Sequence, residues 1–220
     1  MKLLRVISLL MAVAAAMSLH AIDLKAVEVD VKMHPDRYRK LLARFEKADT
    51  TLTPSELATV YFGYSFTSDY DPRENFPEIE EAYGAGNYEQ AARMCEEALR
   101  YNPVSLGLNV LALASADRLR GKGSYGAKIL RFGIRSDMIA TAILESGSGT
   151  TATSPFFVIS EADMKRVLNN VLGIERIIDR TKVGHVDAIK VKFPGNDRQH
   201  ILYFDNSRER QFLNSQPSNH

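Results

Sequence analysis

Arg118, Arg131 and Arg135 stand in a stretch of the chain that carries positive charge only. Residues 118–135 contain six lysines and arginines and no acid, whereas residues 69–97 contain nine acids against two arginines. Guanidinium groups bind carboxylates and phosphates through paired hydrogen bonds. These arginines, with Tyr83, are therefore the candidates to line a groove that binds an anionic segment. Charge complementarity between neighbouring helices, or simple solvation, is the favoured explanation of the charge pattern.

Two histidines and an aspartate near the C-terminus are the candidates for metal binding. His185, Asp187 and His200 share one face of an expected hairpin whose turn is 194–197. This turn places His200 opposite Val191, about 13 Å along the strand from Asp187 at about 3.3 Å per residue. The three side chains therefore cannot hold one ion, and we expect no metal site and no cofactor.

The candidate nucleophiles are better explained as structural residues. Cys95 is followed by Glu96 and Glu97, which disfavour a thiolate, so we interpret it as a small buried hydrophobe. Ser146 and Ser148 lie in a Gly-Ser-Gly run that lacks the strand and helix of an esterase elbow. We assign no catalytic residue. An enzyme whose site forms only at a domain junction, for example from His185 with Asp187, is kept as an alternative.

The elements that must position these residues begin with helices. Pro35 and the apolar spacing after it predict a helix over 35–47. Thr53 and Glu56 form a capping box, which predicts a second helix to about residue 65. Its aromatic residues, between Tyr61 and Tyr70, could form a ligand cage, but core packing is the better interpretation because they supply a large apolar area.

Residues 86–103 resemble the second helix of a tetratricopeptide repeat. Ala91 and Ala98 provide small side chains seven positions apart, and Pro103 ends the helix. The preceding helix, 75–83, departs from the pattern. A second hairpin is expected from 104–119 and 124–144, which together would make a short solenoid. Tetratricopeptide grooves that grip a terminal carboxylate use lysine and asparagine, and that clamp is absent here. The corresponding groove positions hold the following residues: Arg73, Phe76, Glu80, Tyr83, Gly107, Val110, Ala114 and Asp117.

Residues 146–155 are small and polar, and we interpret them as a linker. The spacing of the apolar residues is helical before this stretch and mostly strand-like after it. Beyond it we expect a short strand at 156–160, a helix over 160–172 capped by Ser160 and Asp163, and strands at 175–180, 183–193 and 198–205. The fold class is therefore α+β: tetratricopeptide-like helical hairpins at 22–145, then a small antiparallel β-rich module with one helix at 156–213. Residues 214–220 are expected to be a disordered tail.

The N-terminus has the pattern of a secretory signal peptide. Lys2 and Arg5 precede an apolar run, 6–16, that is too short to span a bilayer, and cleavage is expected after Ala21 or after Ala16. No other segment is long and apolar enough to span a membrane. The single cysteine excludes an intrachain disulfide and offers no lipid attachment site near the leader. We expect a periplasmic or secreted protein.

Composition is that of an ordinary globular protein. Of the 220 residues 45% are hydrophobic, and loss of the leader's two basic residues changes the formal charge from +1 to −1. A chain so nearly neutral is not expected to bind nucleic acid.

Several separate segments together resemble an exported family of the Bacteroidota, domain of unknown function 4919. They are the leader, 61–72, the Gly-Ser-Gly stretch, 157–160 and 203–205. The family has no established activity, so the resemblance implies no catalytic residues. We expect a protein- or peptide-binding or scaffolding module of the cell envelope. An envelope hydrolase or other enzyme, and a purely structural envelope component, are the alternatives.

Overall fold

The helices and strands follow the expected α+β order. The computed structural model describes residues 22–73 and 76–216. Its first helices are α2 (Leu24–Met33), α3 (Pro35–Glu46) and α4 (Pro54–Tyr64). Two hairpins follow: α5 (Pro77–Gly84) with α6 (Tyr88–Ala98), and α7 (Leu106–Arg118) with α8 (Tyr125–Leu144). The C-terminal part consists of β1 (Phe156–Phe157), α9 (Glu161–Arg166), a π-helical turn (Val167–Val171), β2 (Arg176–Val183), β3 (Val186–Lys192), β4 (Gln199–Asp205) and α10 (Ser207–Ser215).

Side-chain caps mark the starts of α2, α4, α7 and α9. The Thr53 hydroxyl accepts from the Glu56 backbone N–H, and the Glu56 carboxylate accepts from the Thr53 N–H, so the expected capping box is confirmed. The Ser160 hydroxyl likewise caps α9. Helix α2 is an element that we did not expect. It begins after Asp23, whose carboxylate accepts two backbone N–H groups.

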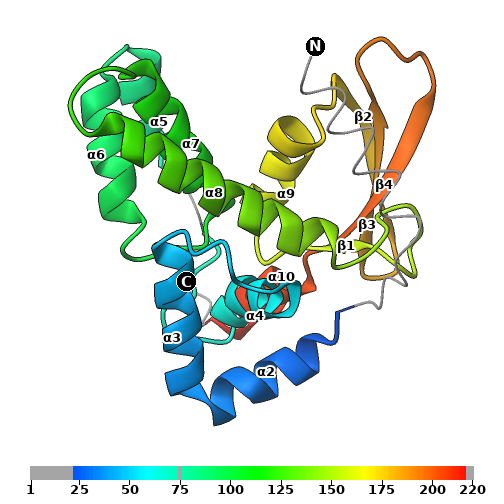
Figure 1. Cartoon of the computed structure of the whole chain (residues 1–220). Coiled ribbons are helices and arrows are strands. Elements are labelled where there is room, and N and C mark those ends of the chain that lie inside the picture. The colour runs from blue at the N-terminus through cyan, green and yellow to red at the C-terminus, as the bar shows by residue number, and fades with distance from the viewer. Residues whose placement is uncertain (1–21, 74–75, 217–220) are drawn as a thin grey trace.

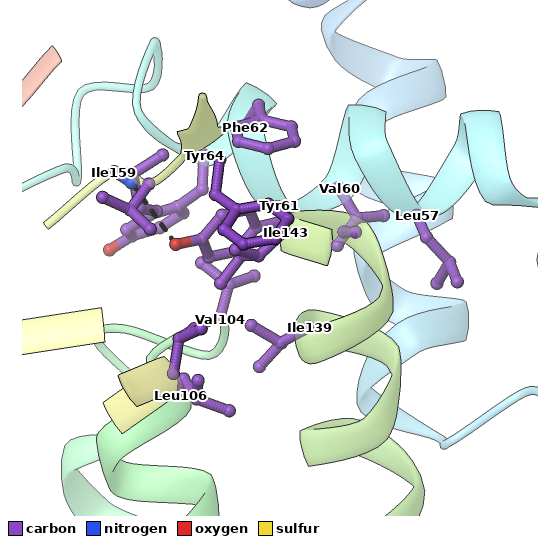
Figure 2. Packing of buried hydrophobic residues seen from close by; sticks show 14 of the residues in the cluster. Leu57, Val60, Tyr61, Phe62, Tyr64, Val104, Leu106, Ile139, Ile143 and Ile159 are labelled. Atoms are coloured by element: carbon purple, nitrogen blue, oxygen red, sulfur yellow. Dashed lines mark hydrogen bonds between the residues drawn. The ribbon is translucent and has the colours of Figure 1, made fainter. Parts of the chain in front are cut away.

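One hydrophobic core extends from the first helices to the sheet. Tyr61 and Phe62 of α4 are each 1% exposed, and their cluster includes Ile143 of α8 and Phe204 of β4. Figure 2 shows the Tyr61 side chain among the residues of α8, with its hydroxyl directed toward Ile159. The aromatic residues of α4 are therefore core residues, as expected.

Helix α8 connects the two parts of the molecule. It runs from the hairpin formed by α5 and α6, through the middle of the molecule, to the start of the sheet (Figure 1). Consecutive helices from α5 to α8 pack on one another, which agrees with a short helical repeat. Their assignment as tetratricopeptide repeats stays a prediction.

The sheet has the order β1-β4-β3-β2 and is mixed. The register of the last hairpin is confirmed, since Val191 pairs with His200 and Asp187 with Phe204. The expectation of an entirely antiparallel module was wrong for β1, which is parallel to β4. The chain between β1 and β4 contains α9, the π-helical turn, β2 and β3, so no local turn sets the direction of β1 relative to β4.

Residues 146–155, expected to be a linker, are held by hydrogen bonds. The buried Ser146 hydroxyl accepts from the Phe157 backbone N–H at 2.8 Å, and the Gly149 carbonyl accepts from the Tyr203 N–H at 2.8 Å. Gly147 lies so close to Pro155 that an added Cβ would be 2.0 Å from its carbonyl oxygen. This stretch is small and polar because it packs tightly against the neighbouring backbone.

Helix α10 gives the C-terminal module a second helix, whereas the sequence predicted only one. It extends through Ser215, so the first two residues of the expected tail are helical, whereas 217–220 lie outside the described residues. The expected signal peptide, 1–21, also lies outside them. None of the helices in the described ranges is long and apolar enough to cross a membrane.

Candidate functional site

The turns of the two hairpins enclose a recess of about 830 Å³, which we call the turn recess. One side is the start of α6, and the other is the end of α7 with the start of α8. Gly121, at a φ of 87°, reverses the chain between α7 and α8. The residues that give the recess its chemistry are four cations and two aromatic rings: Arg93, Arg118, Lys122, Lys128, Tyr88 and Tyr125.

The cations of the turn recess are mostly unneutralised. Among the described residues, no carboxylate lies within 4 Å of the basic groups of Arg93, Arg118 or Lys122. Lys128 forms an ion pair with Glu96 at 2.8 Å. Glu89 is the acid that also lines the recess. The recess therefore has an excess of positive charge, which favours an anionic ligand.

Tyrosines hold Arg118 in place. Its guanidinium lies 5.6 Å from the centre of the Tyr88 ring, within the range of a cation–π contact. A hydrogen bond with Tyr83 raises the pKa of Arg118, so the group stays charged. The Tyr83 and Tyr88 rings pack edge to face at 5.3 Å. Two residues that the sequence singled out, Tyr83 and Arg118, are thus brought together.

Arg131 and Arg135 lie elsewhere. Arg131 is 3.8 Å from Glu96, with 43% of its side chain exposed, and does not line the turn recess. Arg135 is only 5% exposed and donates to the Pro103 carbonyl at 2.6 Å. Its guanidinium lies 5.1 Å from the Phe45 ring, and burial lowers its pKa to about 10. The expectation that Arg135 lines a surface groove was wrong, because its position on α8 faces the helix core.

A second recess, which we call the junction cleft, lies where α5 and α7 meet α9 and α10. Its volume is about 500 Å³. The groove positions Arg73, Phe76, Glu80 and Gly107 all line it. Helix α9 occupies part of this groove, because Arg166 forms an ion pair with Glu80 of α5 at 2.9 Å. The chain itself therefore narrows the groove that a repeat protein would offer to a partner.

Asp163 fastens α9 to the helical part. Its carboxylate accepts from the Tyr61 hydroxyl at 2.8 Å and from the Leu106 backbone N–H at 3.0 Å. The Ser160 hydroxyl accepts from the Asp163 backbone N–H at 3.0 Å, and a side-chain hydrogen bond also joins the two residues, so Ser160 and Asp163 meet at the start of α9 as expected. Burial raises the pKa of Asp163 to about 6.

The histidine expected to pair with Asp187 contacts another acid. His185 Nε2 lies 3.3 Å from a carboxylate oxygen of Asp205, and 71% of the His185 side chain is exposed. Asp187, with 1% of its side chain exposed, is held by Arg180 and Lys182 of β2 at 3.1 and 2.7 Å. These ion pairs explain why an aspartate is tolerated at a buried sheet position.

Neither metal binding nor cysteine chemistry is indicated in the described parts of the chain. No group of three or more histidine, cysteine, aspartate and glutamate side chains within 22–73 and 76–216 is arranged to hold a metal ion. Cys95 is fully buried, and burial raises its pKa to about 12. This environment agrees with the structural interpretation of Cys95.

Sequence reasoning found part of the turn recess and missed the rest. The block of positive charge indicated Arg118 and Lys128, but not Arg93, which lies in the acidic stretch. Helical spacing could have linked Arg93 to Glu89, which also lines the recess, because residues at i and i+4 share a helix face. The contribution of α10 to the junction cleft had no signal of this kind.

Comparisons with known proteins give a family and no activity. No curated protein and no solved structure gives a significant match to the chain. A family model described as a domain of unknown function, DUF4919, matches residues 25–215. This match covers the helical hairpins, the sheet and both recesses, and the chain therefore belongs to the DUF4919 family.

Proposed function

We propose that this chain is a binding protein that takes an acidic segment of a protein partner into the turn recess. The observation that carries the proposal is the set of three cations, Arg93, Arg118 and Lys122, without carboxylate partners in the described structure. Arginine binds carboxylates through two parallel hydrogen bonds, so Arg118, held by its tyrosines, is the expected anchor.

The size and composition of the recess support a peptide segment over a single ion. Its volume of about 830 Å³ is in the range of ligand sites that enclose several chemical groups. Tyr88 and Tyr125 add flat apolar surfaces beside the cations, and tyrosines of this kind are common at protein interfaces. An acidic segment would match both the charge and the rings.

Exchange of one charge tests the proposal. Fluorescence anisotropy would measure the binding of a short labelled peptide of alternating glutamate and glycine, with a glutamine version as the neutral probe. Arg118→Glu is expected to weaken binding of the acidic peptide at least about tenfold, which is about 1.4 kcal/mol. Arg100→Glu, an equal change at an exposed arginine that does not line the recess, is the matched control.

Two results would contradict the proposal. If both variants weaken binding alike, the peptide responds to net charge and not to the recess. If the glutamate and glutamine peptides bind alike, carboxylates are not what the recess recognises. Added salt is expected to weaken the acidic complex, because these cations are exposed to solvent.

We also propose that the protein is exported and acts as a binding or scaffolding module in the periplasm or outside the cell. The support is the N-terminal pattern, in which Lys2 and Arg5 precede an apolar run. N-terminal sequencing of the protein from cell fractions tests this. A processed chain beginning after Ala21 or Ala16 is expected in the envelope or medium, and an unprocessed chain in the cytoplasm would contradict it.

An envelope enzyme is the alternative that has one specific contact in its favour. The exposed imidazole of His185 against the buried carboxylate of Asp205 is the orientation that a general base requires. Under this hypothesis, any hydrolase activity of the purified protein is lost in His185→Ala with folding unchanged. Activity that survives the substitution would remove the hypothesis.

A further inference from the structure

The junction cleft has an apolar floor and charged walls. Phe76 and Leu111, which are partly buried, supply the apolar surface, and Gly107 beside them in the lining adds no side chain. The walls come from α9, which packs against α7, and from Glu209 of α10. A ligand in this cleft therefore meets hydrocarbon below and polar groups at its sides.

The basic residues of the cleft already have carboxylate partners. Arg166 pairs with Glu80 at 2.9 Å, and Lys165 pairs with Glu161 at 3.2 Å. Arg73 pairs with Asp71, which lies on its own loop, at 2.5 Å. The three cations are thus neutralised within the chain, and two of the three glutamates that line the cleft are used to do it.

Glu209 is the glutamate that remains. Within the described residues, no lysine, arginine or histidine nitrogen lies within 4 Å of its carboxylate. One carboxylate oxygen accepts from the Glu161 backbone N–H at 2.6 Å, and the Asn206 side chain is its second partner. These neutral donors hold the carboxylate in position without balancing its charge. Desolvation raises the pKa of Glu209, as expected for a half-buried carboxylate without a counter-ion.

We propose that the junction cleft binds the side chain of a lysine residue of a partner protein, with its ammonium on Glu209 and its hydrocarbon stem on Phe76 and Leu111. A lysine side chain has these two parts in this order: an apolar chain of four carbons and a charged end. An ammonium at Glu209 would complete the ion pair that the chain leaves open. Charge complementarity therefore selects lysine over an acidic or a purely apolar group.

This site is independent of the turn recess. The two recesses share no lining residue, and they take ligands of opposite charge. A failure of the acidic peptide to bind the turn recess leaves the lysine site untouched, and the reverse also holds. The variants that test the two sites do not overlap.

Two small probes separate the contribution of the ammonium from that of the stem. Nα-acetyl-lysine methylamide and Nα-acetyl-norleucine methylamide share the hydrocarbon stem, but only the first carries a charge. Each would be titrated into the isotope-labelled protein, and NMR shifts of the cleft residues would report binding. We expect the lysine probe to bind at least about fivefold more tightly, which is about 1 kcal/mol.

Three variants locate the interaction. Glu209→Gln keeps the shape of the side chain and is expected to reduce the affinity of the lysine probe to that of the norleucine probe. Glu97→Gln, the same change on an exposed part of α6, is expected to bind both probes as the unaltered protein does. Ala162→Phe adds bulk to the cleft wall and is expected to abolish the shifts from both probes.

Each of several results would overturn the proposal. These are equal affinities of the two probes, full affinity for lysine in Glu209→Gln, or cleft resonances that neither probe shifts. Binding that persists in Ala162→Phe would place the lysine outside the cleft. If Glu209→Gln fails to fold, which its NMR spectrum would show, the comparison of the two probes on the unaltered protein decides the question.

Discussion

Asp163 makes the stability of the protein depend on pH in a way that one substitution can isolate. Its side chain is buried between α4, α7 and α9 and accepts from Tyr61 and Leu106. Burial raises its pKa from 3.8 to about 6, so the folded protein binds this proton more tightly than the unfolded chain does. Asp163→Asn keeps the size of the side chain and removes the titration.

The magnitude follows from the pKa shift. Raising the pKa from 3.8 to about 6 corresponds to about 3 kcal/mol, at about 1.4 kcal/mol for each tenfold change in proton affinity. Because the folded pKa is raised, the stabilising contribution is complete below the unfolded value of 3.8 and is lost as the pH rises through about 6. Relative to Asp163→Asn, the wild-type protein should lose between about 2 and 3 kcal/mol from about pH 4 to pH 7.

Urea unfolding followed by circular dichroism, at a series of pH values, measures this difference directly. The change of this difference with pH carries the test, because the amide also alters the hydrogen bonds that the carboxylate makes with Tyr61, Leu106 and Ser160. Asp36→Asn, with 79% of the aspartate side chain exposed, is the matched control and should give a curve parallel to the wild type. Parallel curves for Asp163→Asn as well would refute the reasoning, because the carboxylate would then titrate alike in both states.

Three further predictions concern stability and reactivity. Arg135→Met should lower the free energy of unfolding by about 2 kcal/mol, because it removes the hydrogen bond to a buried carbonyl. Arg131→Met, at an exposed site, should change the free energy of unfolding by less than about 0.5 kcal/mol. Urea titration of the two variants measures both values. Gly147→Ala should destabilise the folded protein by about 2 to 3 kcal/mol, since the added Cβ would lie 2.0 Å from a carbonyl oxygen. Gly126→Ala, in α8 with open space around it, should stabilise the folded protein by up to about 1 kcal/mol in the same assay. Cys95 should react with a thiol reagent only after unfolding, because it is buried and its pKa is raised to about 12; fast reaction of the native protein would show that it is accessible.

Most of the secondary structure could be predicted because its signals are local. The capping box at Thr53 and Glu56 places the start of α4. The four-residue turn at 194–197 sets the register in which Val191 faces His200. Such signals act between residues that are close in the chain, so their outcome depends little on the rest of the molecule. The start of α2 carried a comparable signal in Asp23, although no helix was expected there.

The candidate sites were predictable only in part. The block of positive charge indicated Arg118, which lines the turn recess, and equally Arg135, which is buried against Phe45. Both are arginines on neighbouring helices, and charge alone does not say which helix face meets the core. Glu209 had no signal, because its role depends on where α10 packs.

The sequence by itself determined the order of the strands and of the helices other than α2 and α10, the hairpin register and the structural role of the α4 aromatic residues. Tertiary structure alone decided that β1 runs parallel to β4, that Asp163 binds Tyr61 from a position 102 residues away, and that α9 enters the groove of the hairpins. The physical reason is the range of the interactions. Caps and turns are satisfied by neighbours in the chain, whereas a buried carboxylate or an open cleft depends on which distant surfaces pack together.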